Sequence, residues 1–289
     1  MDAIDQIVQQ VDQFPTLPDV ALRAMRQLDS EDATLDEITD TISLDQRLAG
    51  RIMKLANSPA FGATRPAESL KPAIFRLGMR EVRVAVLTVA VMDAIPSLPP
   101  PHDLRTFWTL ALASAMVARS LADDLGYENP EEAYLAALVH LIGEVFLALQ
   151  FTQRYEEAIA TSRADDLPFE CALVEKFGCD HAAVGARVLL EWNFPPAIIE
   201  AVRCQFRPER AENHGLLASL VFASDRMCRD VGLGSDAPKE VGAWLSSIPA
   251  VLQARLESSR YPDLGNYMSE MRERLDQIEE FARAIFHES

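Results

Sequence analysis

The sequence predicts an all-α protein. Helix-start patterns recur along the chain, each with a capping residue before an acidic or glutamine residue and an apolar run. Apolar residues then recur at helical spacing, as Leu48, Ile52 and Leu55 do. One run, residues 82–95, is rich in β-branched residues and resembles a buried strand. It has no second such run with which to pair, and a lone strand leaves backbone groups unsatisfied, so we interpret it as a helix.

The first helices are predicted from paired capping residues. In chain order these pairs are Thr16 with Asp19, Thr34 with Glu37, and Ser43 with Gln46. The third helix ends at Asn57-Ser58-Pro59, where Asn57 suits a C-terminal cap. Ser69 opens the next segment and Gly78 ends it as a further cap.

The second half of the chain carries similar signals. Asn129-Pro130 is followed by two glutamates, which is a strong helix start because proline suits the first helical position and acids suit the first turn. Asp180 precedes another apolar helical run, and Pro195-Pro196 precede the next. All of these segments support the same fold class.

Proline marks the clearest internal boundary. The stretch PSLPPPH, residues 96–102, cannot continue a helix. We therefore predict an N-terminal helical part at 1–98, a larger helical part at 99–230 and a C-terminal helical extension at 231–289. The extension ends in an amphipathic helix with an apolar seam, formed by Met268, Met271, Leu275, Ile278, Ala282 and Ile285. This seam either packs on its own chain or forms a homodimer, and the spacing does not decide between them.

Composition limits the classes of partner and the location that we expect. The 289 residues include 44 acidic and 27 basic side chains, for a formal charge of −17. Such a surface repels phosphate backbones and anionic lipids, so we expect neither nucleic acid nor a membrane as partner. The apolar run 133–151 is interrupted by His140 and Glu144, which favours a buried helix over a membrane span. No cysteine pair has metal or redox spacing, so free thiols and a cytoplasmic location are expected.

No nucleotide-loop, nucleophile-elbow or zinc-protease motif occurs, so the histidines are the main candidates for chemistry. His102 in the proline linker and His287 near the end are expected to be solvated, and His214 belongs to a polar helix start. His140 and His181 lie on apolar helix faces. They are either ordinary core residues or members of one pocket with the carboxylates of Glu144 and Asp225, and spacing leaves both interpretations open.

Several blocks together resemble the HDOD domain, a bacterial signalling module related to HD-type metal phosphohydrolases. The blocks are FPTLPDVALRAMRQL, ISLDQRLAGRIMKLANSPAFG, SLKPAIFRLGMREVRVAVLTVAV, EEAYLAALVHLIGEVFLAL and EKFGCDHAAVGARVLLEWNFPPAIIEAVRCQF. The most specific stretches are Leu55 to Gly62 and Ala73 to Gly78. The resemblance covers about residues 14–206 and extends more weakly to Asp225, and it implies an HD-like helical bundle.

In the HD superfamily a first histidine, an adjacent His-Asp pair and a later aspartate hold a metal that activates water. By the resemblance, the first histidine falls near Leu110 and the paired aspartate is Leu141, while Glu144 replaces a lysine. Only His140 and Asp225 survive, and a catalytic metal needs about three protein ligands. The resemblance therefore implies no metal, no cofactor and no enzyme activity, with His140 buried and hydrogen-bonded as a structural residue.

We thus expect a non-catalytic regulatory module that binds protein partners in two-component or cyclic-dinucleotide signalling. The family-motif residues Asn57, Ser58, Gly62 and Gly78 are structural or interaction candidates. One alternative is a phosphohydrolase with an atypical ligand set, namely His140, Glu144, His181 and Asp225. Another is a nucleotide sensor that uses the vestigial pocket, with Arg76, Arg80 and Arg83 as candidate anion ligands.

Overall fold

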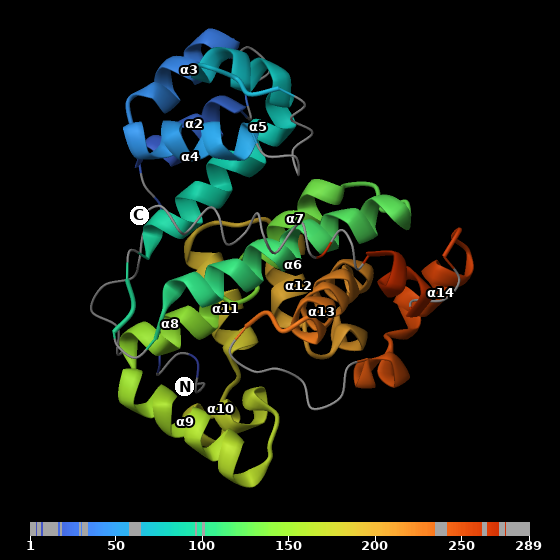
Figure 1. Cartoon of the computed structure of the whole chain (residues 1–289). Coiled ribbons are helices and arrows are strands. Elements are labelled where there is room, and N and C mark those ends of the chain that lie inside the picture. Colours follow the sequence, from blue (N-terminus) through green and yellow to red (C-terminus); the bar gives the residue numbers. More distant parts are fainter. Residues whose placement is uncertain are drawn as a thin grey trace. The chain divides into compact units, whose positions relative to one another are not determined.

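The structure is a computed structural model, and it describes residues 4, 7, 17, 19–28, 30, 34–57, 65–95, 97–99, 102–234, 242–261, 265–271 and 275. Those residues contain helices, turns and loops but no strand, which confirms the all-α prediction. The chain forms two compact units (Figure 1). One is Pro15–Pro96 with Glu280–Ser289, and the other is Met1–Phe14 with Ser97–Glu279. The division after Pro96 falls two residues before the boundary predicted at 98.

The smaller unit contains helices α2 to α5. Their bounds are Asp19–Leu28 for α2, Leu35–Ser43 for α3, Gln46–Ala56 for α4 and Leu70–Ala94 for α5. Helix α5 packs against each of the other three. The buried side chains at their contacts include Ile38, Ile42, Ile52 and Ile74, so the periodic apolar positions of the sequence form this core.

The predicted caps have mixed outcomes. Thr34 and Glu37 form the capping box: the Thr34 hydroxyl accepts from the Glu37 N–H, and the Glu37 carboxylate accepts from the Thr34 N–H. The prediction for Ser43 is wrong, because Ser43 is still the last residue of α3 and its hydroxyl donates to Thr39 O. Asp45, directly before α4, caps that helix instead and accepts from two backbone N–H groups. Thr16 lies outside the described residues.

Gly78 interrupts α5. Its φ of 77° and ψ of 165° are not helical, and the helix resumes directly after it. A Cβ at this position would meet nothing within 4 Å, so glycine is required by the positive φ and not by space. The strand-like run after Gly78 lies in the second half of α5 and is buried from Val84 to Met92, which confirms the helical interpretation.

Asn57 follows the last residue of α4, and its side chain is hydrogen-bonded to the backbone of Ala67, shortly before α5. Its side-chain oxygen accepts from Ala67 N–H at 2.6 Å, and its side-chain nitrogen donates to Ala67 O at 3.2 Å. The residue therefore does more than the predicted capping, because it fixes the segment that leads into α5. Ser58 and Gly62 lie outside the described residues.

The larger unit contains the remaining helices. Their bounds are Leu104–Asp124 for α6, Pro130–Val139 for α7, Ile142–Gln150 for α8, Thr152–Asp165 for α9, Phe169–Phe177 for α10, His181–Glu191 for α11, Pro196–Arg203 for α12, Gly215–Asp230 for α13 and Ala250–Glu257 for α14. Helix α6 packs along α7 and α13, and α8 packs against α11 (Figure 1). The stretch Pro130–Gln150 is long and apolar enough to cross a membrane, but 89% of its most apolar window is buried, as in a core helix.

A loop before α13 is anchored by Glu200 of α12. The Glu200 carboxylate accepts from the backbone N–H groups of Glu212, Asn213 and His214, at 2.7 Å, 3.3 Å and 2.9 Å. Burial alone would raise the pKa of Glu200, but these hydrogen bonds lower it below the ordinary value. His214 thus stands at the start of α13, as the sequence predicts.

The described part of the C-terminal segment packs on its own chain. Tyr267, Met271 and Leu275 are 1%, 1% and 2% exposed. The Tyr267 hydroxyl donates to Asp124 at the end of α6, and Met271 contacts the hydroxyl of Ser120. The seam residues Ile278, Ala282 and Ile285 lie outside the described residues, and homodimerisation through this helix stays a prediction.

Candidate functional site

His140 occupies the turn between α7 and α8. It is fully buried, and each ring nitrogen faces an oxygen acceptor. Nδ1 lies 2.5 Å from Ala137 O, and Nε2 lies 3.1 Å from Asp225 Oδ1, so both ring nitrogens are within hydrogen-bond distance of an acceptor. The prediction of a buried, hydrogen-bonded His140 is confirmed.

Asp225 of α13 is the partner of His140, and Arg229 of the same helix also binds it. Both carboxylate oxygens of Asp225 accept from Arg229 Nε, at 2.9 Å and 3.0 Å, one helical turn later. Burial would raise the pKa of Asp225, but the Arg229 charge and the His140 hydrogen bond hold it well below its ordinary value. His140, Asp225 and Arg229 form a hydrogen-bonded cluster, which we call the closed triad.

His181, the first residue of α11, lies beside the closed triad but is not hydrogen-bonded to it. Its ring lies between Phe169 and Phe206, with centroids 6.3 Å and 5.0 Å away. Neither ring nitrogen has a hydrogen-bond partner among the described residues, and the nearest carboxylate oxygen, on Glu144, is 3.9 Å from Nε2. Burial, followed by the positive charges of Arg229 and His140, lowers the pKa of His181 to about 3, so the ring is neutral at pH 7.

A close helix crossing places Glu144 near His181. Gly143 of α8 lies against the backbone of α11, where an added Cβ would come within 2.0 Å of His181 O and 2.4 Å of Gly185 N. Only glycine fits this contact. One oxygen of the Glu144 carboxylate lies 3.9 Å from His181 Nε2, and the other accepts from the Tyr155 hydroxyl at 2.7 Å. The two helices thus bring the residues at 140–144 and 181 together.

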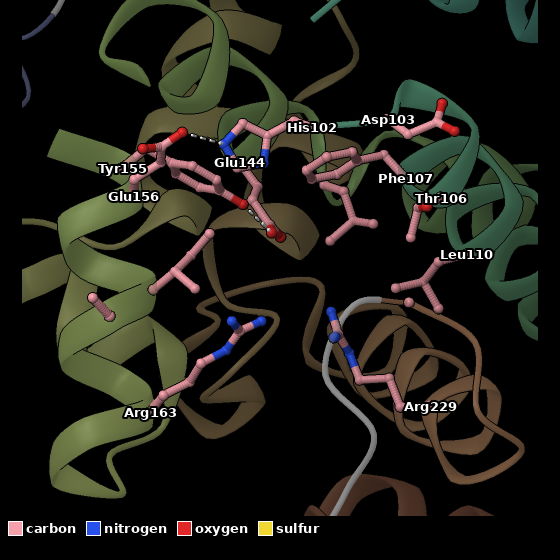
Figure 2. A pocket seen from close by; sticks show the side chains of 14 residues that line it. His102, Asp103, Thr106, Phe107, Leu110, Glu144, Tyr155, Glu156, Arg163 and Arg229 are labelled. Atoms are coloured by element: carbon pink, nitrogen blue, oxygen red, sulfur yellow. Dashed lines mark hydrogen bonds and ion pairs between the residues drawn. The ribbon is translucent and has the colours of Figure 1, made fainter. Parts of the chain in front are cut away.

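A cavity of about 460 Å³ lies beside Glu144 and Tyr155, which belong to its lining (Figure 2). Its apolar lining includes Phe107, Leu110, Leu141 and Ile159. Its polar lining includes His102, Glu144, Tyr155, Glu156, Arg163 and Arg229. The four predicted pocket residues therefore gather at one place: Glu144 lines the cavity, Asp225 contacts its lining residue Arg229, and His140 and His181 stand behind them.

Two lining residues were missed or misjudged from the sequence. His102 was expected to be solvated, but its side chain is only 11% exposed and its ring meets Tyr155 edge-on at 5.0 Å. Arg163 carries no motif, and only the fold places it at the cavity. Conversely, Arg76, Arg80 and Arg83 belong to α5 of the other unit and do not line this cavity. His287 lies outside the described residues.

The residues present do not fit a catalytic metal. Leu110 and Leu141 contribute hydrocarbon to the lining, and the described residues contain no group of three or more His, Cys, Asp or Glu side chains that could hold an ion. Asp225, the best remaining carboxylate, is bound by the Arg229 guanidinium and by the His140 ring. A divalent cation there would face the positive charge of Arg229, which disfavours its binding.

A comparison with protein families matches the HDOD domain model over residues 14–208. The chain belongs to the HDOD domain family. This match covers the blocks on which the resemblance was based and confirms it. HDOD domains are related in fold to HD phosphohydrolases, so the helical architecture is the one expected of this family.

Solved structures agree with this assignment. An HDOD domain protein of unknown function from Geobacter sulfurreducens has a TM-score of 0.87 and 26% identity, covering 99% of this chain and 97% of its own. A Shewanella amazonensis protein, proposed to be a phosphohydrolase, has a TM-score of 0.76 and 25% identity, covering 97% of this chain and 98% of its own.

A relative found by sequence is longer than this chain. It is an uncharacterised Treponema pallidum protein, 24% identical over 221 residues, which are 75% of this chain but 43% of that protein. The chain therefore matches less than half of that relative.

Proposed function

We propose that this HDOD protein is a non-catalytic regulatory module of bacterial signalling, which acts in the cytoplasm by binding protein partners. The closed triad is the observation that carries this proposal. The residues that match the metal ligands of HD hydrolases, His140 and Asp225, are hydrogen-bonded to each other, and Arg229 binds the same carboxylate. These contacts support the proposal, because a catalytic metal needs about three protein ligands and Asp225 is already bound by Arg229.

The proposed partner contact involves the smaller unit. Leu44 and Phe75 are 65% and 77% exposed there, which is unusual for large apolar side chains. Exposed apolar residues support protein binding when they are covered in a complex. Two-component and cyclic-dinucleotide pathways are the settings in which we propose that this binding operates.

Hydrolase assays test the catalytic half of the proposal. Purified protein should not hydrolyse a chromogenic phosphodiester or a cyclic dinucleotide in the presence of manganese. The opposite result would be turnover above background that is lost in His140→Ala while the variant stays folded. That pattern would establish the atypical phosphohydrolase instead.

Capture experiments test the partner half. Tagged wild-type protein and Phe75→Ser should be expressed in the source organism, cross-linked and compared by mass spectrometry. We expect a specific partner that the wild type retains and Phe75→Ser loses. Leu190→Ser, which changes a 51% exposed apolar residue of α11, is the matched control and should keep the partner. Equal recovery with all three proteins would reject the smaller unit as the docking surface.

A further inference from the structure

Two arginines face the cavity from opposite walls. Arg163 lies in the last turn of α9 and Arg229 in the last turn of α13, and Figure 2 shows both side chains directed into the same space. Asp225 balances the charge of Arg229, whereas within the described part of the chain no carboxylate forms an ion pair with Arg163. An anion between the two walls would supply the missing negative charge and accept hydrogen bonds from both sides.

The cavity lining also contains acidic groups. The carboxylates of Glu144 and Glu156 line it, with the Tyr155 hydroxyl bonded to Glu144 (Figure 2). His102 Nε2 is buried without a hydrogen-bond partner in the described structure, and the nearest Glu156 oxygen is 3.9 Å away. These groups would accept hydrogen bonds from N–H or O–H groups, and they would repel a second anion.

Part of the cavity lining is apolar. It includes Phe107, Leu110 and Leu141, so the uncharged part of a ligand would be a flat or hydrocarbon body. The volume of about 460 Å³ lies within the range of pockets that enclose a small organic molecule, and it exceeds what one inorganic anion needs. Leu110 and Leu141, at two positions mapped to metal ligands, thus belong to the apolar part of the lining.

We infer that the cavity binds a small phosphomonoester of mononucleotide size, without a metal ion, with its phosphate between Arg163 and Arg229. A tetrahedral phosphate directs oxygens toward both walls, whereas a planar carboxylate is already satisfied by one guanidinium. The carboxylates of Glu144 and Glu156 in the lining favour a ligand with a single phosphate group over one with two. The site is distinct from the proposed partner surface, and ligand binding does not depend on it.

Calorimetric titration with adenosine and guanosine monophosphates, in low salt with EDTA, tests the inference. We expect at least one of the two to bind, inorganic phosphate to compete with it, and the matching nucleoside to bind at least about tenfold more weakly. Recovery of the intact nucleotide afterwards separates binding from hydrolysis, so failure of this inference is distinct from failure of the non-catalytic proposal. No binding of either nucleotide, or binding only when manganese replaces EDTA, would overturn it.

Two variants locate the site. Arg163→Gln changes an exposed side chain, so the fold should be kept while the affinity falls about tenfold. Ala160→Trp fills the cavity from α9 without a change in charge and should abolish binding. Arg210→Gln removes the same charge from an exposed position outside the cavity and is the matched control. Unchanged affinity in both cavity variants, or an equal loss in the control, would contradict the assignment.

Discussion

The closed triad and the cavity beside it contain the same kinds of residues in opposite states. In the closed triad every charged group meets a partner: His140 and Arg229 both donate to Asp225. A few residues away, His181 is buried with both ring nitrogens unpartnered among the described residues, and His102 Nε2 lacks a hydrogen bond there too. The closed triad is hydrogen-bonded into the fold, and of its three residues only Arg229 lines the cavity, whereas His102 at the cavity wall keeps a ring nitrogen available to a ligand or to water.

Leu110 and Leu141 occupy two of the positions that the resemblance maps to metal ligands, and both line the cavity. Arg229 binds the carboxylate of Asp225, which maps to another of these positions. Variants that open the closed triad should therefore cost stability, and variants at the unpartnered residues should not.

The largest effect is expected from Arg229→Met. It leaves Asp225 buried with only His140 as partner, and breaking a buried ion pair costs about 3–5 kcal/mol of unfolding free energy. Chemical denaturation followed by circular dichroism measures the loss. Arg187→Met breaks an i,i+4 pair with Glu191 on the surface and should change stability by less than about 0.5 kcal/mol. Equal effects of the two variants would show that the closed triad is not a stabilising unit.

The second-largest loss of stability is expected from Gly143→Ala. The added methyl group meets the α11 backbone at 2.0 Å, so α8 must move and the unfolding free energy should fall by about 3 kcal/mol. The comparison variant is Gly50→Ala in α4, where nothing lies within 4 Å of the added carbon. There the stability should rise by about 0.5–1 kcal/mol, because alanine is the better helix former. A neutral Gly143→Ala would refute the close crossing that places Glu144.

The smallest effect is the pH dependence due to His181. Its pKa is about 3 in the folded chain and near 6.5 when unfolded, so the unfolded state binds a proton first as the pH falls. The part of the unfolding free energy that depends on a neutral His181 is therefore fully present above pH 6.5, and it is lost as the pH falls toward 3. His181→Phe should flatten the stability–pH curve between pH 6.5 and 4.5, by at most about 1.4 kcal/mol per pH unit. The pKa values of Asp225 and Glu200 are lowered in the folded chain, so these two groups change the unfolding free energy mainly below this pH window.

The comparison of His181→Phe with the wild type isolates the titration of His181. The ionisable neighbours Arg229, His140 and Asp225 are present in both proteins. Thermal unfolding over this pH range is sufficient. An unchanged slope in His181→Phe would mean that the histidine is solvated or paired, contrary to its burial.

Local chemistry explains which features the sequence could predict. Thr34 and Glu37 lie three residues apart, so their capping box needs no tertiary information. His140 was predicted to be buried from its apolar neighbours, and this is confirmed. Its bond to Asp225 joins residues 85 positions apart, and only the crossing of helices brings them together. The Asp225–Arg229 pair, by contrast, has i,i+4 spacing and could have been found from sequence.

The cavity was harder to predict because its residues come from unrelated patterns. His102 follows a proline-rich stretch that usually indicates a solvated linker, yet it packs against Tyr155 of α9. Arg163 has the exposed position of an ordinary surface arginine. Neither residue carries a motif, so their chemistry depends on the arrangement of α6, α8, α9 and α13 alone.

The most direct measurement is a titration of manganese into the purified wild-type protein, combined with elemental analysis of the protein as isolated. With His140 and Arg229 both bonded to Asp225, we predict no stoichiometric manganese binding and no metal retained through purification. One bound ion per chain, lost in a folded His140→Ala variant, would contradict the proposal that a closed triad occupies the positions where HD hydrolases hold their metal.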